Sequence, residues 1–551
     1  MLSRKMLFTQ NKQNGGGVFL LLSKISFYGT TLILAILILA LCFKFYDKTE
    51  NKNDNEVNSE YIASYFDGEY QNQIPGKHDG YYVEKIVCDN GASATWNNAE
   101  WGINIRNATQ KIKCSIYFKK MYSDGVIAEP PSLLQGLIPV VYNDSGDVIV
   151  ADVEKEWYNY KEHKWANAVL VNCSDSTIKL KYFNDDMSLK ETAIGTTMSM
   201  DDILQMYVYV PRYKYKLFNA ENGTSDEQAI EIAFESIKSV KSSGTKNGEW
   251  LTHPAFTFGD TELPGIWVGK FEASGSTENY TIKPNLKALD NLNIATMYNT
   301  AKVITTDKYN NYGTNQNESD SHLIKNMEWG AVTYLTNSIY GRYSDSSTCI
   351  TSGCEVWINN INSGYGSGTA VSGQPQWGPS ITGCAGASTN IGYAISQNYC
   401  VSGYDWKTKG VNASTTGNQY GVYDMSGGTW EYVMGFQKDS SGEVQYGYSG
   451  FDSSNMPDSK YYDLYDYQEN DSANYSRYHL GDAAKEILKD TTTHGSDNWW
   501  NDAVYTIYSS IPCIARGGYS TYGKVAGIFS SNRYNGGAST VISFRTVITE
   551  S

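Results

Sequence analysis

The longest apolar run of the chain lies near its N-terminus. Residues 25–43 carry no charge and are rich in Leu, Ile and Ala. At about 1.5 Å per residue, this run nearly spans a hydrocarbon core of about 30 Å. Residues 1–24 hold four basic residues and no acidic one, which predicts a cytoplasmic N-terminus. No A-x-A-like cleavage site follows, so the pattern predicts a single-pass anchor in the cell membrane with an extracellular ectodomain.

A polar stalk is expected over 44–60, followed by a segment with strand periodicity. Apolar and polar residues alternate over 61–125, which predicts a small antiparallel β module. A disulfide between Cys88 and Cys114 would close this module and stabilise so small a unit by about 3 kcal/mol. A β-rich connecting region is expected over 126–194.

Two segments have apolar residues at helical spacing. One covers 225–240, and the other covers 321–340 and ends before Gly341. Elsewhere the chain is rich in Gly and aromatic residues, with 50 Gly, 44 Tyr and 13 Trp. The residues by themselves therefore indicate a loop-rich β or α+β protein.

Charge and aromatic content narrow the range of partners. The net charge is −15, and since phosphate binding needs a basic face, no nucleic-acid partner is expected. Aromatic side chains are favoured at binding surfaces, although tyrosines also fill strand positions. At 551 residues the chain is expected to form two or three domains.

Eight of the nine cysteines follow the predicted anchor, an even number that is consistent with disulfides. The local pairs expected from spacing are Cys88–Cys114, Cys349–Cys354 and Cys384–Cys400. Whether Cys173 and Cys513 meet is open. The chain has no CxxC and no HExxH motif, so neither a zinc site nor a His-based metal site is expected.

Three motifs follow one another in the C-terminal half. They are YDMSGGTWEY at 423–432, RGGY at 516–519 and SFR at 543–545, preceded by ELPGIWVGKFEAS at 262–274. Together they resemble the formylglycine-generating-enzyme/sulfatase-modifying-factor superfamily. The resemblance covers about 195–551. It implies that this segment is a C-type lectin-like domain and that the fold class is α+β.

In that family the segment around the tryptophan holds a calcium ion. The resemblance implies that the side chains of Asp424 and Glu431 and the carbonyls of Gly427 and Thr429 are the ligands here. Oxygen ligands of this kind are what calcium prefers. The alternative is a metal-free turn with Trp430 in the core.

The oxidase branch of the family uses two cysteines that bind copper shortly after RGG. The corresponding positions here are Tyr522 and Gly527, and neither supplies the thiolate that this chemistry needs. No Ser/His/Asp order or spaced carboxylate pair suggests another reaction, so no catalytic residue is assigned.

A binding scaffold is the function that the resemblance then implies. In binding proteins of this fold, the stretch between RGG and the last strand forms the ligand face, and its composition here suits recognition loops. The predicted contacts are Tyr519, Tyr522, Ser530, Asn532, Arg533 and Tyr534. They would bind an extracellular protein or glycan, as in an adhesin or receptor. Polar loop surface without a ligand, a structural envelope or fibre component, and an enzyme with unrecognised chemistry are the alternatives.

Overall fold

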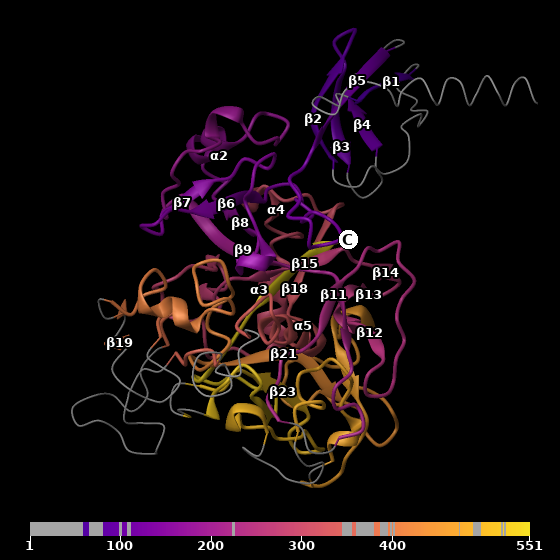
Figure 1. The fold of residues 1–551 in the computed structure, drawn as a ribbon, viewed down its shortest axis with the longest axis vertical. Helices are drawn as coiled ribbons and strands as arrows, with labels where there is room; N and C mark the ends of the chain where they lie inside the picture. The colour runs from indigo at the N-terminus through magenta and orange to yellow at the C-terminus, as the bar shows by residue number, and fades with distance from the viewer. Residues whose placement is uncertain are drawn as a thin grey trace, which may run out of the picture. The chain divides into compact units, whose positions relative to one another are not determined.

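The structure is a computed structural model in which strands predominate (Figure 1). It describes residues 59–65, 81–97, 102–106, 112–222, 226–343, 355–359, 380–385, 395–396, 399–400, 403–472, 474–488, 498–519, 522 and 525–551. Residues Glu60–Ser551 form one unit.

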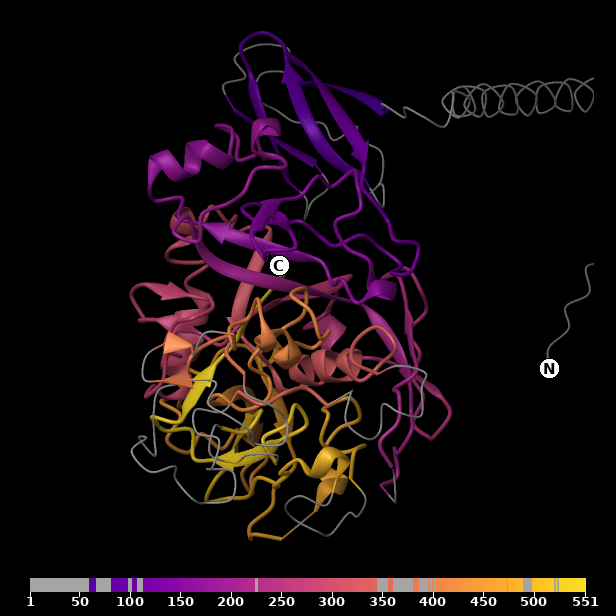
Figure 2. The same cartoon turned by 60° about the vertical axis from the view of Figure 1, so that its left-hand side comes forward.

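The largest sheet has seven strands in the order β18-β26-β15-β9-β8-β6-β7, and every neighbouring pair is antiparallel. The strands are β6 (Ile138–Tyr142), β7 (Val148–Val150), β8 (Asn167–Val171), β9 (Ile203–Pro211), β15 (Gly265–Gly269), β18 (Ser319–Leu323) and β26 (Thr546–Glu550). The C-terminus lies at this sheet in both views (Figures 1 and 2). Because β8 and β9 pair, residues on both sides of the predicted boundary at 195 share one sheet.

A second sheet carries the C-terminal motifs. Its strands are β22 (Asp463–Tyr465), β21 (Trp430–Gln437), β23 (Cys513–Arg516) and β24 (Ser531–Tyr534) in that order, and β25 (Ile542–Phe544) also pairs with β21. Every residue of β21 is buried. The strand that begins at Trp430 is therefore a core strand, flanked on both edges by C-terminal segments.

The remaining strands form small sheets. They are β1 (Ser59–Tyr65), β5 (Ile112–Lys120) and β2 (Tyr81–Cys88); β3 (Ser93–Asn97) and β4 (Gly102–Arg106); β11 (Ile232–Phe234), β10 (Tyr213–Lys216) and β12 (Trp250–Thr252); β13 (Thr257–Phe258) and β14 (Thr261–Glu262); β16 (Ser274–Gly275) and β17 (Tyr280–Thr281); and β19 (Ile395–Ser396) and β20 (Tyr399–Cys400).

The helices of the described chain are few and short. They are α2 (Ser176–Tyr182), α3 (Ile294–Lys302), α4 (Tyr309–Tyr312) and α5 (Asn326–Thr336). The predicted α+β class, with its C-type lectin-like domain, is therefore wrong, because most of the regular structure is β-sheet. Aromatic residues, which are frequent in this chain, favour strands.

The two predicted helices have different outcomes. Within 225–240, Ile232–Phe234 forms β11 and pairs with β10, so this helix prediction is wrong. Sheet pairing supplies backbone hydrogen bonds that a short helix with one weak apolar face does not secure by itself. Within 321–340, α5 confirms the helix, but the first residues belong to β18. The helix begins later because the Glu328 side chain accepts a hydrogen bond from the Lys325 N–H at 2.8 Å.

The predicted membrane anchor has no counterpart in the described residues. None of the helices described is long and apolar enough to cross a membrane. The longest, α5, has 11 residues, whereas a span needs about 20. The predicted span at 25–43 lies outside the described residues, as does 1–24 and all but the end of 44–60. The described residues therefore contradict the predictions of a single-pass cell-membrane protein, of a membrane partner and of an extracellular location.

Two of the predicted disulfides are confirmed, Cys88–Cys114 between β2 and β5 and Cys384–Cys400. The predicted pair Cys349–Cys354 lies outside the described residues. Cys173 and Cys513 are buried free thiols and do not pair with each other. Burial raises the pKa of Cys173 to about 11, so its thiol is unreactive at neutral pH.

Candidate functional site

The second sheet brings three C-terminal tyrosines together over one tryptophan. The ring centroid of Trp430 lies 6.4 Å from that of Tyr519, 5.4 Å from that of Tyr522 and 6.2 Å from that of Tyr534. The rings of Tyr519 and Tyr522 are 4.8 Å apart. Trp430 is fully buried, whereas the three tyrosines are half-buried. We call Tyr519, Tyr522 and Tyr534 the tyrosine face.

Two glycines explain how the chain reaches this face from β23. Gly517 and Gly518 have φ of +83° and +74°, a region that favours glycine. A Cβ at Gly518 would lie 2.5 Å from Ala526, so the loop packs too closely for a side chain. β24 then returns antiparallel to β23 and sets Tyr534 opposite Cys513. The RGG motif therefore has a local role in placing the tyrosines.

The tyrosine face is uncharged and polar. Burial raises the pKa of Tyr522 and of Tyr534, so both phenols keep their protons at neutral pH. Beneath them, the indole N–H of Trp430 is buried and has no hydrogen-bond partner among the described residues. A buried donor without a partner costs about 1–3 kcal/mol.

Arg533 is held in place near this face. Its Nη2 lies 2.7 Å from Oδ2 of Asp471, and its guanidinium lies 5.5 Å and 5.0 Å from the ring centroids of Tyr505 and Tyr508. Asp471 neutralises the arginine, so a ligand here would meet little net charge. The sequence analysis missed Asp471, Tyr505 and Tyr508. The two tyrosines just before the RGG motif were a usable signal, but nothing in the sequence links Asp471 to a residue 62 positions away.

The other two predicted contacts differ in exposure. Ser530 is fully buried, where its hydroxyl donates to the Val525 carbonyl at 2.6 Å and accepts from the Gly527 N–H at 3.1 Å. Ser530 therefore shapes the loop and does not present itself to a ligand. Asn532 is half-buried, and its Oδ1 accepts a hydrogen bond from the Arg533 N–H at 2.8 Å.

The predicted calcium carboxylates are already engaged by protein donors. Both oxygens of Asp424 accept from the Gly383 N–H, at 2.8 Å and 2.9 Å, and Oδ1 also accepts from Asn359 at 3.0 Å. Oε1 of Glu431 lies 2.6 Å from Nη2 of Arg545. Burial raises the pKa of Asp424 to about 6 and that of Glu431 to about 7, against the lowering effect of Arg545.

The turn between these carboxylates is closed by a third acid. Glu272 accepts hydrogen bonds from the N–H and the hydroxyl of Thr429, both at 2.8 Å. A Cβ at Gly427 would lie 2.5 Å from Ile358, so the turn is tightly packed. No group of three or more His, Cys, Asp or Glu that could hold a metal occurs within the described ranges. The predicted set also includes two backbone carbonyls, those of Gly427 and Thr429, so the calcium site stays a prediction.

The positions that the resemblance implies for copper ligands have other neighbours. The Tyr522 ring packs against Trp430. At Gly527, a Cβ would lie 1.9 Å from Oδ1 of Asp502, so a cysteine would collide with a carboxylate. This backbone has no space for a thiol at residue 527.

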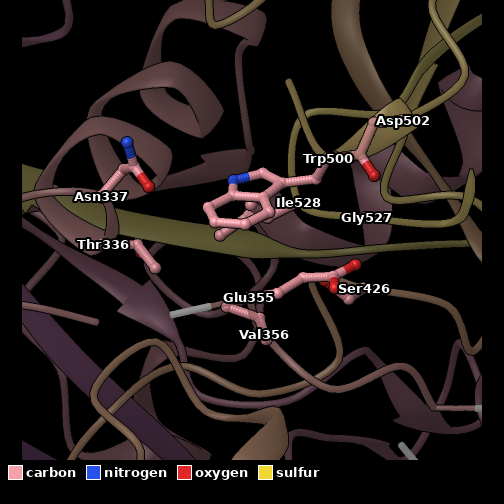
Figure 3. Close-up of a pocket in the computed structure, with 9 residues that line it drawn as sticks. All are labelled: Thr336, Asn337, Glu355, Val356, Ser426, Trp500, Asp502, Gly527 and Ile528. Atoms are coloured by element: carbon pink, nitrogen blue, oxygen red, sulfur yellow. The ribbon is translucent and has the colours of Figure 1, made fainter. Parts of the chain in front are cut away.

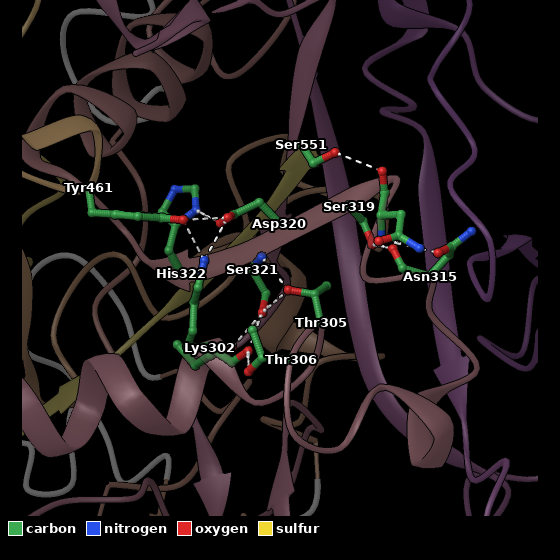
Figure 4. A network of polar contacts seen from close by, with 12 residues as sticks. Lys302, Thr305, Thr306, Asn315, Ser319, Asp320, Ser321, His322, Tyr461 and Ser551 are labelled. Carbon is green, nitrogen blue, oxygen red and sulfur yellow. Dashed lines mark hydrogen bonds and ion pairs between the residues drawn. The ribbon is translucent and has the colours of Figure 1, made fainter. Parts of the chain in front are cut away.

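A buried cluster on β18 and α5 also has the residue types of an active site (Figure 4). His322 lies 3.1 Å from Asp320 and 3.0 Å from Glu328 through its two ring nitrogens. Lys302 and the Tyr461 hydroxyl both bind Oδ2 of Asp320, each at 2.6 Å. Burial alone would lower the pKa of His322, but Glu328 and Asp320 outweigh it and raise this pKa. The two carboxylates therefore favour the protonated form of the imidazole.

The hydroxyl of Ser321, the residue before His322, makes its hydrogen bonds to other residues. Ser321 lies on the opposite face of β18, 2.9 Å from the Thr305 hydroxyl, and donates to the Ala301 carbonyl at 2.8 Å. Neighbouring residues of a strand point to opposite faces, which explains the separation. We interpret the cluster as structural, because its ring nitrogens are both engaged by acids.

No protein-family model matches the chain, and no curated protein matches it. Among solved structures, it is similar to Treponema denticola variable protein 1, with 10% sequence identity over 62% of this chain and 95% of that chain, and a TM-score of 0.21. A likeness at that TM-score carries no argument about fold or function. The resemblance to the sulfatase-modifying-factor superfamily gains no support from these comparisons.

Proposed function

We propose that this protein binds a ligand, a protein or a glycan, on the tyrosine face. The observation that carries the proposal is the cluster of three half-buried tyrosines that pack tilted or edge-on against Trp430. Rings held by their neighbours lose little conformational freedom on binding, and aromatic residues dominate the energetics of many interfaces.

The chemistry of the face favours a polar, uncharged ligand surface. The phenols are protonated and can donate or accept hydrogen bonds, and the ring edges offer apolar area. Arg533 is neutralised by Asp471, so long-range attraction contributes little. Binding is therefore expected to depend weakly on salt.

The test uses the double variant Tyr522→Ala/Tyr534→Ala of the full chain. The intact protein is screened on a glycan array and against a displayed peptide library, and the strongest hit is then titrated by biolayer interferometry. We expect the double variant to bind at least about 30-fold more weakly, as truncation of a central aromatic residue usually costs that much or more. Tyr467→Ala is the matched control, since Tyr467 is an exposed tyrosine (39%) outside the face.

Thermal unfolding of each variant separates lost binding from lost structure. A double variant that unfolds like the intact protein and binds with unchanged affinity would refute the proposal. So would an intact protein that binds neither the array nor the library. Hits confined to one of the two screens would decide between a glycan and a protein.

A further inference from the structure

A second site lies at the C-terminal end of α5, where a pocket opens between five segments of the chain (Figure 3). Its lining residues are Thr336, Asn337, Glu355, Val356, Ser426, Trp500, Asp502, Gly527 and Ile528. The pocket encloses about 260 Å³ including the space at its mouth, and its deep part has room for about one water-sized group.

Two buried oxygens in this lining lack a hydrogen-bond partner in the described chain. Asp502 is 1% exposed, and its Oδ2 accepts from the Phe529 N–H at 2.9 Å, but its Oδ1 accepts from no donor. The hydroxyl of Ser426, a residue also 1% exposed, has no partner either. A Cβ at Gly527 would lie 1.9 Å from Oδ1, so only a glycine lets the backbone pass this close to the carboxylate. The pocket thus keeps two oxygen acceptors unoccupied by the protein.

The surroundings of Asp502 disfavour its charged form when no cation is near. Burial raises the pKa of Asp502 well above 3.8, and the nearby charge of Glu355 raises it further. Arg516 offsets this only in part, because its guanidinium donates to the carbonyls of Asp482 and Ala483. A buried carboxylate without a close cation is unfavourable, so a positively charged group that enters the pocket is stabilised there.

Trp500 forms an aromatic wall of this pocket. In Figure 3 its indole lies between Asn337 and Asp502. The φ of Trp500, +57°, is rare for a bulky residue, and its backbone N–H donates a hydrogen bond to Oε1 of Glu227 at 3.1 Å. Residues kept in such conformations cluster at ligand sites. An aromatic ring beside a carboxylate is a pair that recognises organic cations.

We propose that this pocket binds a primary ammonium group, such as the end of a lysine side chain, on a ligand that approaches the protein from solution. Asp502 is the counter-ion, Ser426 accepts one N–H, and Trp500 packs on the methylene stem. The room for one water-sized group matches an ammonium and is too small for a guanidinium. The site shares no residue with the tyrosine face, so either proposal can fail alone.

Calorimetric titration of the full chain with Nα-acetyl-lysine amide tests the proposal. We expect this compound to bind, the norleucine analogue, which has a similar stem and no charge, not to bind, and the arginine analogue to bind at least about tenfold more weakly. Asp502→Asn should weaken lysine-amide binding by about tenfold or more, and Ser426→Ala by a few-fold. Ser543→Ala is the matched control and should leave affinity unchanged. Ser543 does not line the pocket, and its hydroxyl is also buried and has no hydrogen-bond partner among the described residues.

Three results would overturn the proposal. They are equal binding of the lysine and norleucine compounds, no binding of the lysine compound, and unchanged affinity in Asp502→Asn. If Asp502→Asn does not fold, the analogue series and Ser426→Ala decide the question. If the pocket holds only water, none of the three compounds would give a heat of binding, and this result would also refute the proposal.

Discussion

Two buried acidic clusters of this protein differ in how many of their carboxylate oxygens have hydrogen-bond partners. Around Asp320, every acid faces a cation or a hydroxyl, supplied by His322, Lys302 and Tyr461 (Figure 4). Around Asp502, one carboxylate oxygen has no donor in the described chain (Figure 3). A complete network holds a fold together, whereas an incomplete one has capacity left for a ligand.

The electrostatics of the two aspartates follow from this difference. Burial alone would raise the pKa of Asp320, but its bonds to His322 and Lys302 outweigh burial and lower it below 3.8. For Asp502, burial and the charge of Glu355 act in the same direction and raise the pKa well above 3.8. The same residue type, buried in both places, is thus favoured as an anion at Asp320 and disfavoured as an anion at Asp502.

The largest expected effect separates the two aspartates by stability. Asp320→Asn should lower the free energy of unfolding by about 3 kcal/mol, because it leaves buried cations with one partner fewer. Asp502→Asn should stay within about 1 kcal/mol of the parent, because it removes a charge that the fold does not compensate. Urea denaturation at neutral pH measures both. Equal losses in the two variants would show that the clusters are energetically alike and would break the comparison.

Asp320 and Asp502 should contribute to the pH dependence of stability with opposite signs. The pKa of Asp320 is depressed in the folded state, so its contribution is present above pH 3.8 and is lost as pH falls through the folded value. The pKa of Asp502 is raised, so its contribution is complete below pH 3.8 and is lost as pH rises through the folded value.

Denaturation of the parent and both Asn variants between about pH 3 and pH 8 would show these slopes. Asp320→Asn should remove a loss of stability on the acid side, and Asp502→Asn a loss on the alkaline side. Each change is limited to about 1.4 kcal/mol per pH unit. Slopes that change in the same direction would contradict the assignment of one complete and one incomplete site.

A smaller effect is expected from two buried serines. Ser321→Ala should lower the free energy of unfolding by about 1–2 kcal/mol, because it removes the hydrogen bonds of the Ser321 hydroxyl with the Thr305 hydroxyl and the Ala301 carbonyl. Ser426→Ala should change it by less than about 0.5 kcal/mol, since its hydroxyl has no described partner to lose. Thermal unfolding of the matched pair checks this. A larger loss for Ser426 would mean that the hydroxyl is bonded in solution.

Local chemistry in the sequence predicted the parts of the site that depend on short-range geometry. The disulfides Cys88–Cys114 and Cys384–Cys400 link residues 26 and 16 positions apart. The RGG turn and the tyrosines after it also lie on one continuous stretch. Ser530 shows the limit of such local predictions. It was predicted to contact a ligand, but its side chain is buried and its hydroxyl donates to the Val525 carbonyl within the loop.

The spacing of residues along the sequence did not predict the contacts between distant segments. The partner of Arg533 is Asp471, and Trp500 meets Ser426 and Gly527 only across the pocket. The helix expected over 225–240 became β11 because β10 was available to pair with it. The spacing of apolar residues gives one element its preference, but the partner that completes its hydrogen bonds is chosen by the whole fold.

The sequence by itself determined that this protein is acidic and that tyrosines follow an RGG turn, and it predicted three short-range cysteine pairs, of which two are confirmed. Only the tertiary structure decided which acids are neutralised, which hydroxyls are left without partners and which ring lies under the tyrosines. The physical reason is that burial sets the cost of each polar group, and burial is shared among segments far apart along the chain.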